Sequence, residues 1–460
     1  MIEGLKPYSE YKESGQKWLG GVPAHWELKP GHAAFAPRKE SNRGMKEKMV
    51  LSLSYGRIKV KTTDKQHGLV PESYETYQVV NEGNVIIRGT DLQNDQTSRR
   101  IGLSRNRGII SSAYLCLQAL PSITPDYGYQ ILNVFDLTKA IYRYGSGLRQ
   151  NLDHGEIKRL PIFLPPVDEQ AAIVRFLDHA NRKIDGFIRA KRNLIGLLNE
   201  QKQAIIHNAV TRGLNPNVSL KPSGARWLGD IPEHWEVVRS RRLFTVRTEL
   251  AGKDDIQLSA TQSYGVIPQA DYEAKIGRRV VKISMHLEKR RHVEKDDFVI
   301  SMRSFEGGIE RAWASGAIRS SYVVMKPDPN VNVPFFSYVL KSPGYIRALQ
   351  ATGDFIRDGQ DLTYGNFRMV DLPMLPLAEQ QQIAKFIESA TNALTGSLAR
   401  TEREIALMQE YRTRLTADIV TGKLDVREAA AKLPNLPEDA ASEPAPNEPL
   451  EEIEPEEIEA

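Results

Sequence analysis

The chain carries the same fourteen-residue frame twice, and this repeat limits what it can fold into more than any other feature. Ser14–Glu27 recurs as Ser223–Glu236, and most positions are identical, including two tryptophans and one histidine. A second shared segment, Leu160–Ile173, recurs as Leu372–Ile383 and keeps a Glu-Gln-x-x-Ile ending. Repeats of this kind indicate duplicated structural units. The sequence therefore predicts two modules of one architecture in a single chain.

The blocks between these shared segments have little in common. Only Val79–Arg88 faintly resembles His292–Arg303. Similar frames with dissimilar contents suggest two modules that do the same job on different targets. The histidines of the frames, His25 and His234, are predicted to be structural rather than catalytic, because each belongs to a segment whose tryptophans are expected to pack against a helix end.

A long helix is expected after each second shared segment. Asp168 and Glu169 suit a helix N-terminus, where capping groups and negative charge are favourable. Apolar residues then recur with a three-four spacing that includes Ile184, Phe187 and Leu194 and reaches Ile205. The copy from Ile383 to Leu415 is more polar in its middle. Each helix of roughly 43 residues would be about 65 Å long. The two helices are predicted to pack as an antiparallel pair, with dimerisation between copies of the chain as the alternative.

The formal net charge of +4 hides an acidic tail. Residues 434–460 contain ten acidic residues, six prolines and no Lys or Arg, so the first 433 residues carry +14. Such a tail is predicted to be disordered. The basic remainder suits a polyanionic partner, although a merely soluble basic protein would have the same composition.

Composition also narrows the class of protein. The single cysteine, Cys116, excludes an internal disulfide and a cysteine-built zinc site. No apolar run reaches the length of a membrane span, and the N-terminus lacks the pattern of a signal peptide. We therefore expect a cytoplasmic protein.

The paired frames resemble the specificity subunits of type I restriction–modification systems. The resemblance rests on Trp-Leu-Gly-x-Ile/Val-Pro-x-His-Trp, on Leu-Pro-x-x-Pro-x-x-Glu-Gln-x-x-Ile, and on the Thr-Arg-Gly and Thr-Gly-Lys helix ends. It covers roughly residues 8 to 426, and it occurs twice. Thr90–Asp95 also resembles a segment of one recurring subtype of target-recognition domain.

The resemblance implies an α+β fold. Two tandem α/β target-recognition domains would be separated by two long helices that form an antiparallel coiled coil with pseudo-twofold symmetry. The expected limits are 1–166 for the first domain, 167–213 for the first helix, 214–376 for the second domain, 377–424 for the second helix, and 425–460 for an acidic, proline-rich disordered tail.

The resemblance also implies a function in DNA sequence recognition. Each domain would read one half of a bipartite, gapped site in double-stranded DNA, and the helical pair would set the gap. The implied partners are two adenine-N6 methyltransferase subunits, which carry S-adenosylmethionine, and endonuclease/translocase subunits, which use ATP and Mg²⁺. No cofactor, metal or catalytic residue is expected in this subunit, and no membrane partner.

The sequence lacks the common catalytic motifs. It has no Asn/Asp-Pro-Pro-Tyr/Phe of an adenine methyltransferase, no Gly-x-Gly-x-x-Gly, no phosphate-binding loop and no His-Glu-x-x-His. A non-catalytic binding subunit fits this best. Two alternatives stay open: a scaffold whose two modules bind proteins, and an enzyme with twin active sites, which the divergence of the two blocks disfavours.

The candidate DNA contacts follow from the chemistry of recognition. Phosphates are bound by Lys and Arg, whereas bases are read by Arg on guanine and by Asn or Gln on adenine. The candidates in the first module are Lys59, Lys61, Arg88, Gln93, Asn94, Arg99, Arg100, Arg105, Arg107 and Arg149. Those in the second module are Arg278, Arg279, Lys289, Arg290, Arg291, Arg303 and Arg357. Any one of these clusters could instead be a solvated surface, and Gln93-Asn94 could be a turn.

Overall fold

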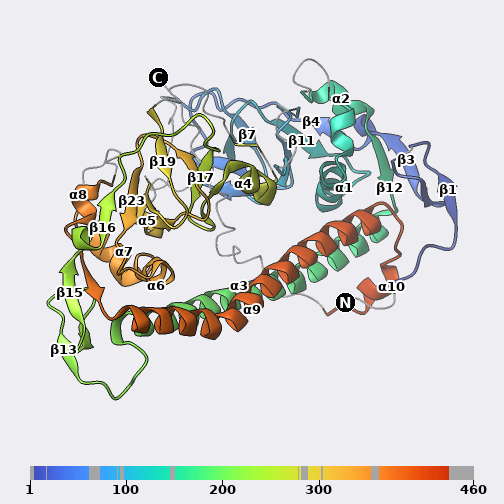
Figure 1. The fold of residues 1–460 in the computed structure, drawn as a ribbon. Coiled ribbons are helices and arrows are strands. Elements are labelled where there is room, and N and C mark those ends of the chain that lie inside the picture. Colours follow the sequence, from blue (N-terminus) through green and yellow to red (C-terminus); the bar gives the residue numbers. More distant parts are fainter. Residues whose placement is uncertain are drawn as a thin grey trace. The chain divides into compact units, whose positions relative to one another are not determined.

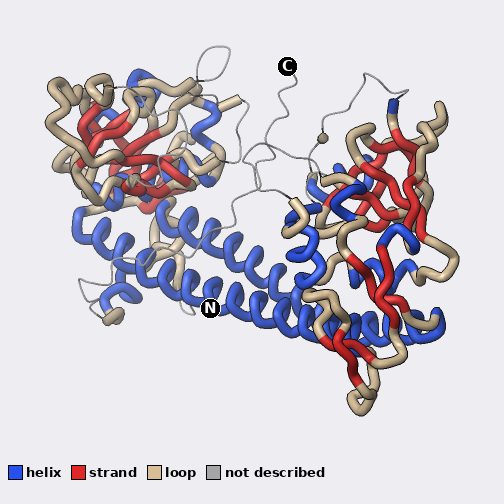
Figure 2. Tube along the Cα trace, turned by 90° about the vertical axis from the view of Figure 1, so that its left-hand side faces the viewer, coloured by secondary structure: helices blue, strands red, loops and turns tan. Residues whose placement is uncertain are grey.

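The computed structural model divides into two units that each contain one module. It describes residues 5–16, 18–61, 73–90, 92–93, 98–145, 151–277, 279–280, 289–301, 304–353 and 362–434. Unit 1 comprises Met1–Lys191 and Arg403–Ala460, and unit 2 comprises Arg192–Glu402. Both divisions fall within the long helices, so each unit contains one end of each helix (Figures 1 and 2). The predicted limits of the two target-recognition domains stay predictions.

Unit 1 is a mixed α/β module. Its strands are β1 (Tyr11–Glu13), β2 (Gly21–Pro23), β3 (Glu27–Pro30), β4 (Phe35–Pro37), β5 (Leu51–Ser54), β6 (Arg57–Val60), β7 (Gln78–Val80), β8 (Val85–Ile87), β9 (Ile101–Leu103), β10 (Gly108–Ile110), β11 (Leu115–Ala119) and β12 (Pro161–Leu164). Its helices are η1 (Gly31–Ala33), α1 (Pro125–Leu137), η3 (Ala140–Arg143), α2 (His154–Arg159), α10 (Arg427–Ala431) and its parts of α3 (Val167–Arg212) and α9 (Leu377–Val420).

Unit 2 is also a mixed α/β module. Its strands are β13 (Leu220–Pro222), β14 (Asp230–Pro232), β15 (Glu236–Arg239), β16 (Phe244–Val246), β17 (Leu258–Thr261), β18 (Gly265–Pro268), β19 (Arg291–Val293), β20 (Phe298–Ile300), β21 (Glu310–Arg311), β22 (Gly316–Ile318), β23 (Val323–Pro327) and β24 (Asp371–Met374). Its helices, besides its parts of α3 and α9, are η4 (Ser240–Arg242), α4 (Gln269–Ile276), α5 (Ser304–Gly307), α6 (Val333–Val339), α7 (Pro343–Gln350) and α8 (Tyr364–Phe367).

The same antiparallel sheet lies at the centre of both units. Its strand order is β4-β11-β8-β9 in unit 1 and β16-β23-β20-β21 in unit 2. The two-stranded ladders match as well: β3 with β12 corresponds to β15 with β24, β5 with β6 to β17 with β18, and β7 with β10 to β19 with β22. Blocks whose sequences have little in common therefore share one topology, which supports the prediction of duplicated modules.

The faint similarity between the two blocks marks one turn in this shared sheet. Between β7 and β8, the buried Asn84 accepts a hydrogen bond through Oδ1 from the backbone N–H of Asn81 at 2.8 Å. Between β19 and β20, the buried Asp297 accepts through Oδ2 from the N–H of Glu294 at 2.8 Å. The polar side chain is retained because it closes the turn.

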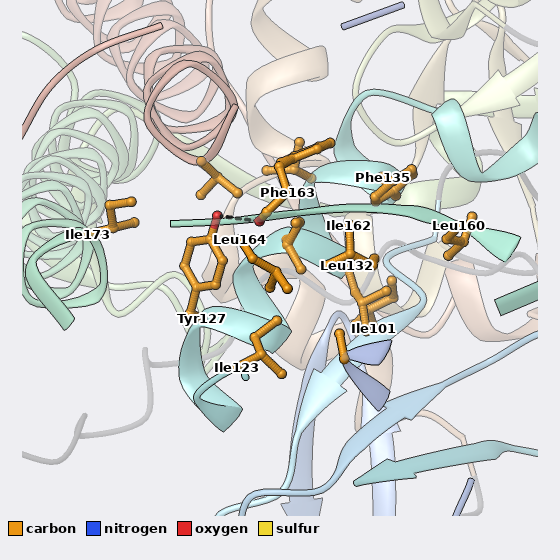
Figure 3. Packing of buried hydrophobic residues seen from close by; sticks show 14 of the residues in the cluster. Ile101, Ile123, Tyr127, Leu132, Phe135, Leu160, Ile162, Phe163, Leu164 and Ile173 are labelled. Carbon is orange, nitrogen blue, oxygen red and sulfur yellow. Dashed lines mark hydrogen bonds between the residues drawn. The ribbon is translucent and has the colours of Figure 1, made fainter. Parts of the chain in front are cut away.

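The core of unit 1 packs α1 and β12 together with the start of α3. Thr124 caps α1 by accepting from the N–H of Tyr127. All four residues of β12 are buried, and the hydroxyl of Tyr127 donates to the carbonyl of Phe163 at 3.1 Å (Figure 3). Ile101 of β9 and Ile173 of α3 belong to the same cluster. The module and the helix therefore share one hydrophobic core.

A carboxylate fixes the start of α3 to the first frame. Oε1 of Glu169 accepts from the hydroxyl of Tyr8 at 2.6 Å and from Nε1 of Trp26 at 2.8 Å, and Oε2 accepts from Nε2 of His25 at 2.7 Å. Glu169 and Trp26 are both buried. A carboxylate in the first helical turn is also favoured by the helix dipole. We call this arrangement of frame Trp, frame His and helix Glu the carboxylate clamp.

Unit 2 repeats the clamp at the start of α9. Glu379 accepts from Nε1 of Trp235 at 3.0 Å and from Nε2 of His234 at 2.9 Å. Its side chain is 26% exposed, against 3% for Glu169. The structural role predicted for His25 and His234 agrees with both clamps.

The glutamine that follows each clamp glutamate holds a second segment of the module. Oε1 of Gln170 accepts from the N–H of Thr124 at 2.8 Å, and Oε1 of Gln380 accepts from the N–H of Asn332 at 2.8 Å. Both glutamines are fully buried, and their amide nitrogens donate to backbone carbonyls. Thr124 and Asn332 are the N-caps of α1 and α6. The Glu-Gln pair therefore joins each helix start to two parts of its module.

In each frame, the tryptophan of the carboxylate clamp also lies against the end of the other long helix. Gly422, which follows α9, lies beside Trp26, and a Cβ there would be 3.2 Å from the indole ring. Gly213, which follows α3, lies beside Trp235, and a Cβ there would be 3.4 Å from the indole ring. Both glycines have positive φ, of 79° and 72°, a conformation that favours glycine at a helix end. Within each unit, one frame therefore holds the start of one long helix and the end of the other.

The two long helices run antiparallel where they meet. In unit 1, Lys191 pairs with Glu404 at 2.6 Å and Arg412 pairs with Asp185, so positions ascend along α3 as they descend along α9. In unit 2, Lys202 Nζ donates to Thr395 at 3.1 Å in the same sense. The prediction of two long helices is confirmed, with 46 residues in α3 and 44 in α9.

The structure corrects two details of the predicted helical region. Leu194, expected to continue the apolar seam, is 39% exposed, whereas Ile188, outside the expected spacing, is buried. The tail was expected to be disordered from residue 425, but α10 follows there, and Val426 and Ala430 are buried in the core of unit 1. Because Val426 and Ala430 are apolar, one face of α10 packs into the core, and the acidic stretch begins only after this helix. Residues 435–460 lie outside the described residues.

The clamps predict unequal costs of losing their glutamates. Glu169→Ala should lower the free energy of unfolding by about 3 kcal/mol, because the buried donors Tyr8 and Trp26 and the more exposed His25 all lose their charged acceptor. Glu379→Ala should cost about half as much, since only two donors depend on a partly exposed carboxylate. Urea unfolding followed by tryptophan fluorescence measures both.

Glu402→Ala, at an exposed position of α9, is the matched control and should change stability little. An equal or smaller loss for Glu169→Ala than for Glu379→Ala would contradict this account of the clamps.

Candidate nucleic-acid interface

The β5–β6 hairpin gathers exposed cations in unit 1. Lys59 and Lys61, both predicted, are exposed along and just after β6, and Arg57, which was not predicted, is exposed next to the turn. Arg99 is exposed beside the turn, since a Cβ on Gly56 would lie 3.1 Å from the Arg99 Cβ. Residues from two distant segments therefore meet here.

Tyr129 of α1 shows that a third segment reaches the same region. Burial raises the pKa of Tyr129, and the positive charges of Arg99, Arg57 and Arg105 oppose that rise. Arg105 is exposed and pairs with Asp126 at 2.6 Å. Three guanidinium groups are thus close enough to act on one phenol, and such a group of cations suits phosphate contacts.

The other described candidates of unit 1 have different neighbours from this group of cations. Arg107 is exposed, with its guanidinium bound to Glu47 at 3.2 Å and to Asn81 at 3.0 Å. Arg88 is half-buried at the end of β8, and Gln93 is exposed. Their role as DNA contacts stays a prediction. Asn94 and Arg149 lie outside the described residues.

Arg100 is a structural residue, which corrects its place among the surface candidates. Its side chain is fully buried. Its Nη1 donates to the carbonyl of Thr90 at 2.7 Å and to that of Arg88 at 3.3 Å, and its Nε donates to the hydroxyl of Tyr142 at 3.3 Å. Its backbone N–H donates to Asp136 at 2.7 Å. The guanidinium therefore joins backbone segments inside unit 1.

The candidates of unit 2 also divide by burial. Arg279 and Lys289 are exposed. Arg291 is half-buried in β19, and its Nη1 donates to the carbonyl of Thr248 at 3.4 Å. Arg290 is 8% exposed, so the structure corrects its place among the surface candidates. Three further candidates, Arg278, Arg303 and Arg357, lie outside the described residues.

An ion pair between a buried carboxylate and a partly exposed lysine joins elements at the sheet edge of unit 2. Nζ of Lys341 lies 2.8 Å from both carboxylate oxygens of Glu310 and donates to the carbonyl of Gln262 at 2.8 Å. Burial raises the pKa of Glu310 to about 7, and the charge of Lys341 opposes the rise. Because Gln262 belongs to the loop between β17 and β18, the pair ties this hairpin to β21.

The described residues contain neither a metal-binding cluster nor a membrane-spanning helix. No group of three or more His, Cys, Asp and Glu side chains among them could hold a metal ion. In the same part of the chain, no helix is both long enough and apolar enough to cross a membrane.

A second, shorter repeat in the sequence, which was not among the predicted features, marks the two hairpin turns. Tyr55-Gly56-x-Ile58 recurs as Tyr264-Gly265-x-Ile267, at the same offset of 209 residues that relates the two frames. The match is too short to notice without the frames as a guide. In the structure it falls on the β5–β6 and β17–β18 turns.

Comparisons with known proteins agree with this architecture. No family model matches the chain. It is 24% identical over 314 residues, 66% of this chain and 69% of the relative, to a putative type I restriction enzyme MjaX specificity subunit of Methanocaldococcus jannaschii. It is 26% identical over 171 residues, 37% of each chain, to the type I restriction enzyme MjaVIII specificity subunit of the same organism.

The chain is similar to type I restriction specificity subunits. The resemblance predicted from the paired frames is thereby confirmed, and the prediction of a non-catalytic subunit agrees with these names. A chain from a solved structure that concerns complex assembly and conformational transition of the type I R-M system has a TM-score of 0.58 at 14% identity. It covers 88% of this chain and 99% of its own length, which shows a shared fold.

The Lys341–Glu310 pair of unit 2 should make the effect of a substitution on stability depend on pH. Lys341→Ala should lower the stability of the protein by about 3 kcal/mol at pH 8.5, because it leaves the Glu310 carboxylate buried without its partner. In the folded protein the pKa of Glu310 lies above its ordinary value, so the folded state binds this proton more tightly than the unfolded state does. The stability of the protein therefore falls as pH rises through about 7. Removing Lys341 raises that pKa further, so the loss should be much smaller at pH 5.5.

Thermal unfolding at the two pH values measures this difference, with the exposed Lys295→Ala as the control. A loss for Lys341→Ala that is the same at both pH values would show that Glu310 does not titrate as described.

Proposed function

We propose that this chain is the DNA sequence-recognition subunit of a type I restriction–modification complex. Each target-recognition domain, 1–166 and 214–376, reads one half of a bipartite, gapped site in double-stranded DNA. One observation carries the proposal: two modules of identical sheet order, held by the same carboxylate clamp, differ in the polar residues on their surfaces. The similarity to specificity subunits supports it.

Shared and divergent residues have different tasks in this proposal. The shared Glu, Gln, His and Trp residues are used inside the protein, where they attach each module to the helices. The divergent blocks carry the exposed cations, such as Lys59 and Arg99 in unit 1 and Arg279 and Lys289 in unit 2. Bases are read by divergent side chains, because the two half-sites differ.

The two long helices set the gap between the half-sites in this proposal. They form an antiparallel coiled coil along 167–213 and 377–424, supported by the Lys191–Glu404 and Arg412–Asp185 pairs in unit 1 and by the Lys202–Thr395 contact in unit 2. The clamps join each module directly to the ends of these helices.

The proposed subunit supplies recognition, and its partners supply chemistry. Two adenine-N6 methyltransferase subunits bring S-adenosylmethionine, and endonuclease/translocase subunits use ATP and Mg²⁺. The helices offer apolar surface for docking, since Leu194 and Leu197 in unit 2 and Leu407 in unit 1 are exposed. The chain itself binds DNA and partners and performs no reaction.

Methylation of genomic DNA tests the proposal. Co-expression of the chain with its neighbouring methyltransferase subunit, followed by single-molecule sequencing for N6-methyladenine, should reveal one gapped motif that is methylated on both strands. A stable complex that binds S-adenosylmethionine but methylates no motif would count against DNA reading and favour a protein scaffold.

A module exchange tests the division of the site. Replacing residues 40–150 with the corresponding block of another specificity subunit should change one half of the methylated motif and leave the other half and the gap unchanged. A reciprocal exchange of the block between the second pair of shared segments is the matched control and should change only the other half. Changes in both halves from a single exchange would contradict independent reading by the two domains.

A further inference from the structure

The tip of one hairpin presents an exposed tyrosine in both units. Tyr55 lies between β5 and β6 and is 44% exposed, and Tyr264 lies between β17 and β18 and is 42% exposed. Each is followed by a glycine with positive φ, of 74° at Gly56 and 73° at Gly265. Large aromatic side chains at matching exposed positions need an explanation, because the surrounding sequences have diverged.

The turn in unit 1 is tight. Ser54 pairs with Arg57, so Tyr55 and Gly56 form a two-residue hairpin loop, and both have positive φ. The first position of such a turn usually carries Asn, Asp or Gly. A tyrosine with φ of 49° is uncommon there, and unusual backbone conformations of this kind concentrate at functional positions.

Both tips rest on the same edge of the shared sheet. A Cβ on Gly56 would lie 3.3 Å from the carbonyl oxygen of Ile101 in β9. A Cβ on Gly265 would lie 2.7 Å from the carbonyl oxygen of Arg311 in β21. These strands are equivalent in the two sheet orders, so the two tyrosines occupy equivalent places in their own units.

Cations accompany both tyrosines. In unit 1, Arg57 follows the Tyr55-Gly56 turn and Arg99 lies beside Gly56, and both are exposed. In unit 2, Nζ of Lys275 lies 5.0 Å from the centre of the Tyr264 ring. A phenol hydroxyl with neighbouring cations suits a phosphate group. The cations come from different positions in the two units, whereas the tyrosine is the same.

We propose that Tyr55 and Tyr264 bind the DNA backbone, each hydroxyl donating to a phosphate oxygen of its half-site. The inference rests on the proposed function. Two modules that read different base sequences can share only those contacts that every sequence offers, and the sugar-phosphate backbone is the part of DNA common to both half-sites. The tyrosines therefore fix the register of each module on the duplex, and divergent neighbours read the bases.

Hydroxyl removal tests this in the complex of the full chain with its methyltransferase subunits. Tyr55→Phe and Tyr264→Phe keep the ring and the turn, and each should weaken binding by about three- to tenfold, the value of one hydrogen bond. The loss should be equal for a duplex with the methylated motif and for one without it, and the motif should not change. Tyr11→Phe, at a 42% exposed tyrosine of β1, is the matched control and should leave affinity unchanged.

The outcomes separate this inference from the proposed function. If the wild-type complex binds its motif but both phenylalanine variants and the corresponding alanine variants bind as tightly, the backbone contact is wrong and the DNA-reading function stands. If a variant changes the motif or weakens only specific binding, the tyrosine reads bases, which also overturns the inference. If the wild-type complex binds no DNA at all, both fail.

Discussion

A carboxylate in the first turn of each long helix, buried in unit 1 and partly exposed in unit 2, makes the interaction on which the rest of this structure depends. Glu169 and Glu379 each accept hydrogen bonds from a frame tryptophan and a frame histidine, at a helix end where the dipole already favours negative charge. The same tryptophans touch the glycines that end the opposite helices, Gly422 and Gly213. Each frame therefore attaches its module to the start of one long helix and to the end of the other.

This arrangement allows the modules to diverge. The shared residues are occupied inside the protein, so the blocks between them are free to change as long as the sheet order is kept. The interior polar groups show how far the change has gone. Unit 1 uses Arg100 with backbone carbonyls at its sheet edge, whereas unit 2 uses Glu310 with Lys341. Different sequences thus stabilise one topology, and the exposed residues differ with them.

Much of this architecture could be predicted from the sequence. The repeated frames and the three-four spacing gave the duplication and the helices from Val167 and Leu377, because tryptophans and helical periodicity are strong local signals. The sheet topology could not be predicted, since its short strands depend on partners far away in the chain. Whether an arginine faces solvent also depends on such partners. The sequence therefore does not distinguish Arg99 from the adjacent Arg100, although only Arg99 is exposed.

Affinity as a function of gap length tests the central claim most directly. The claim is that clamped modules on a helical pair recognise two half-sites at one fixed separation. The complex of the chain with its methyltransferase subunits should bind a duplex with the natural gap at least tenfold more tightly than duplexes whose gap is one base pair longer or shorter, because one base pair shifts a half-site by about 3.4 Å and rotates it around the axis. Equal affinity for all gap lengths would contradict the claim, since modules that move freely could reach either spacing.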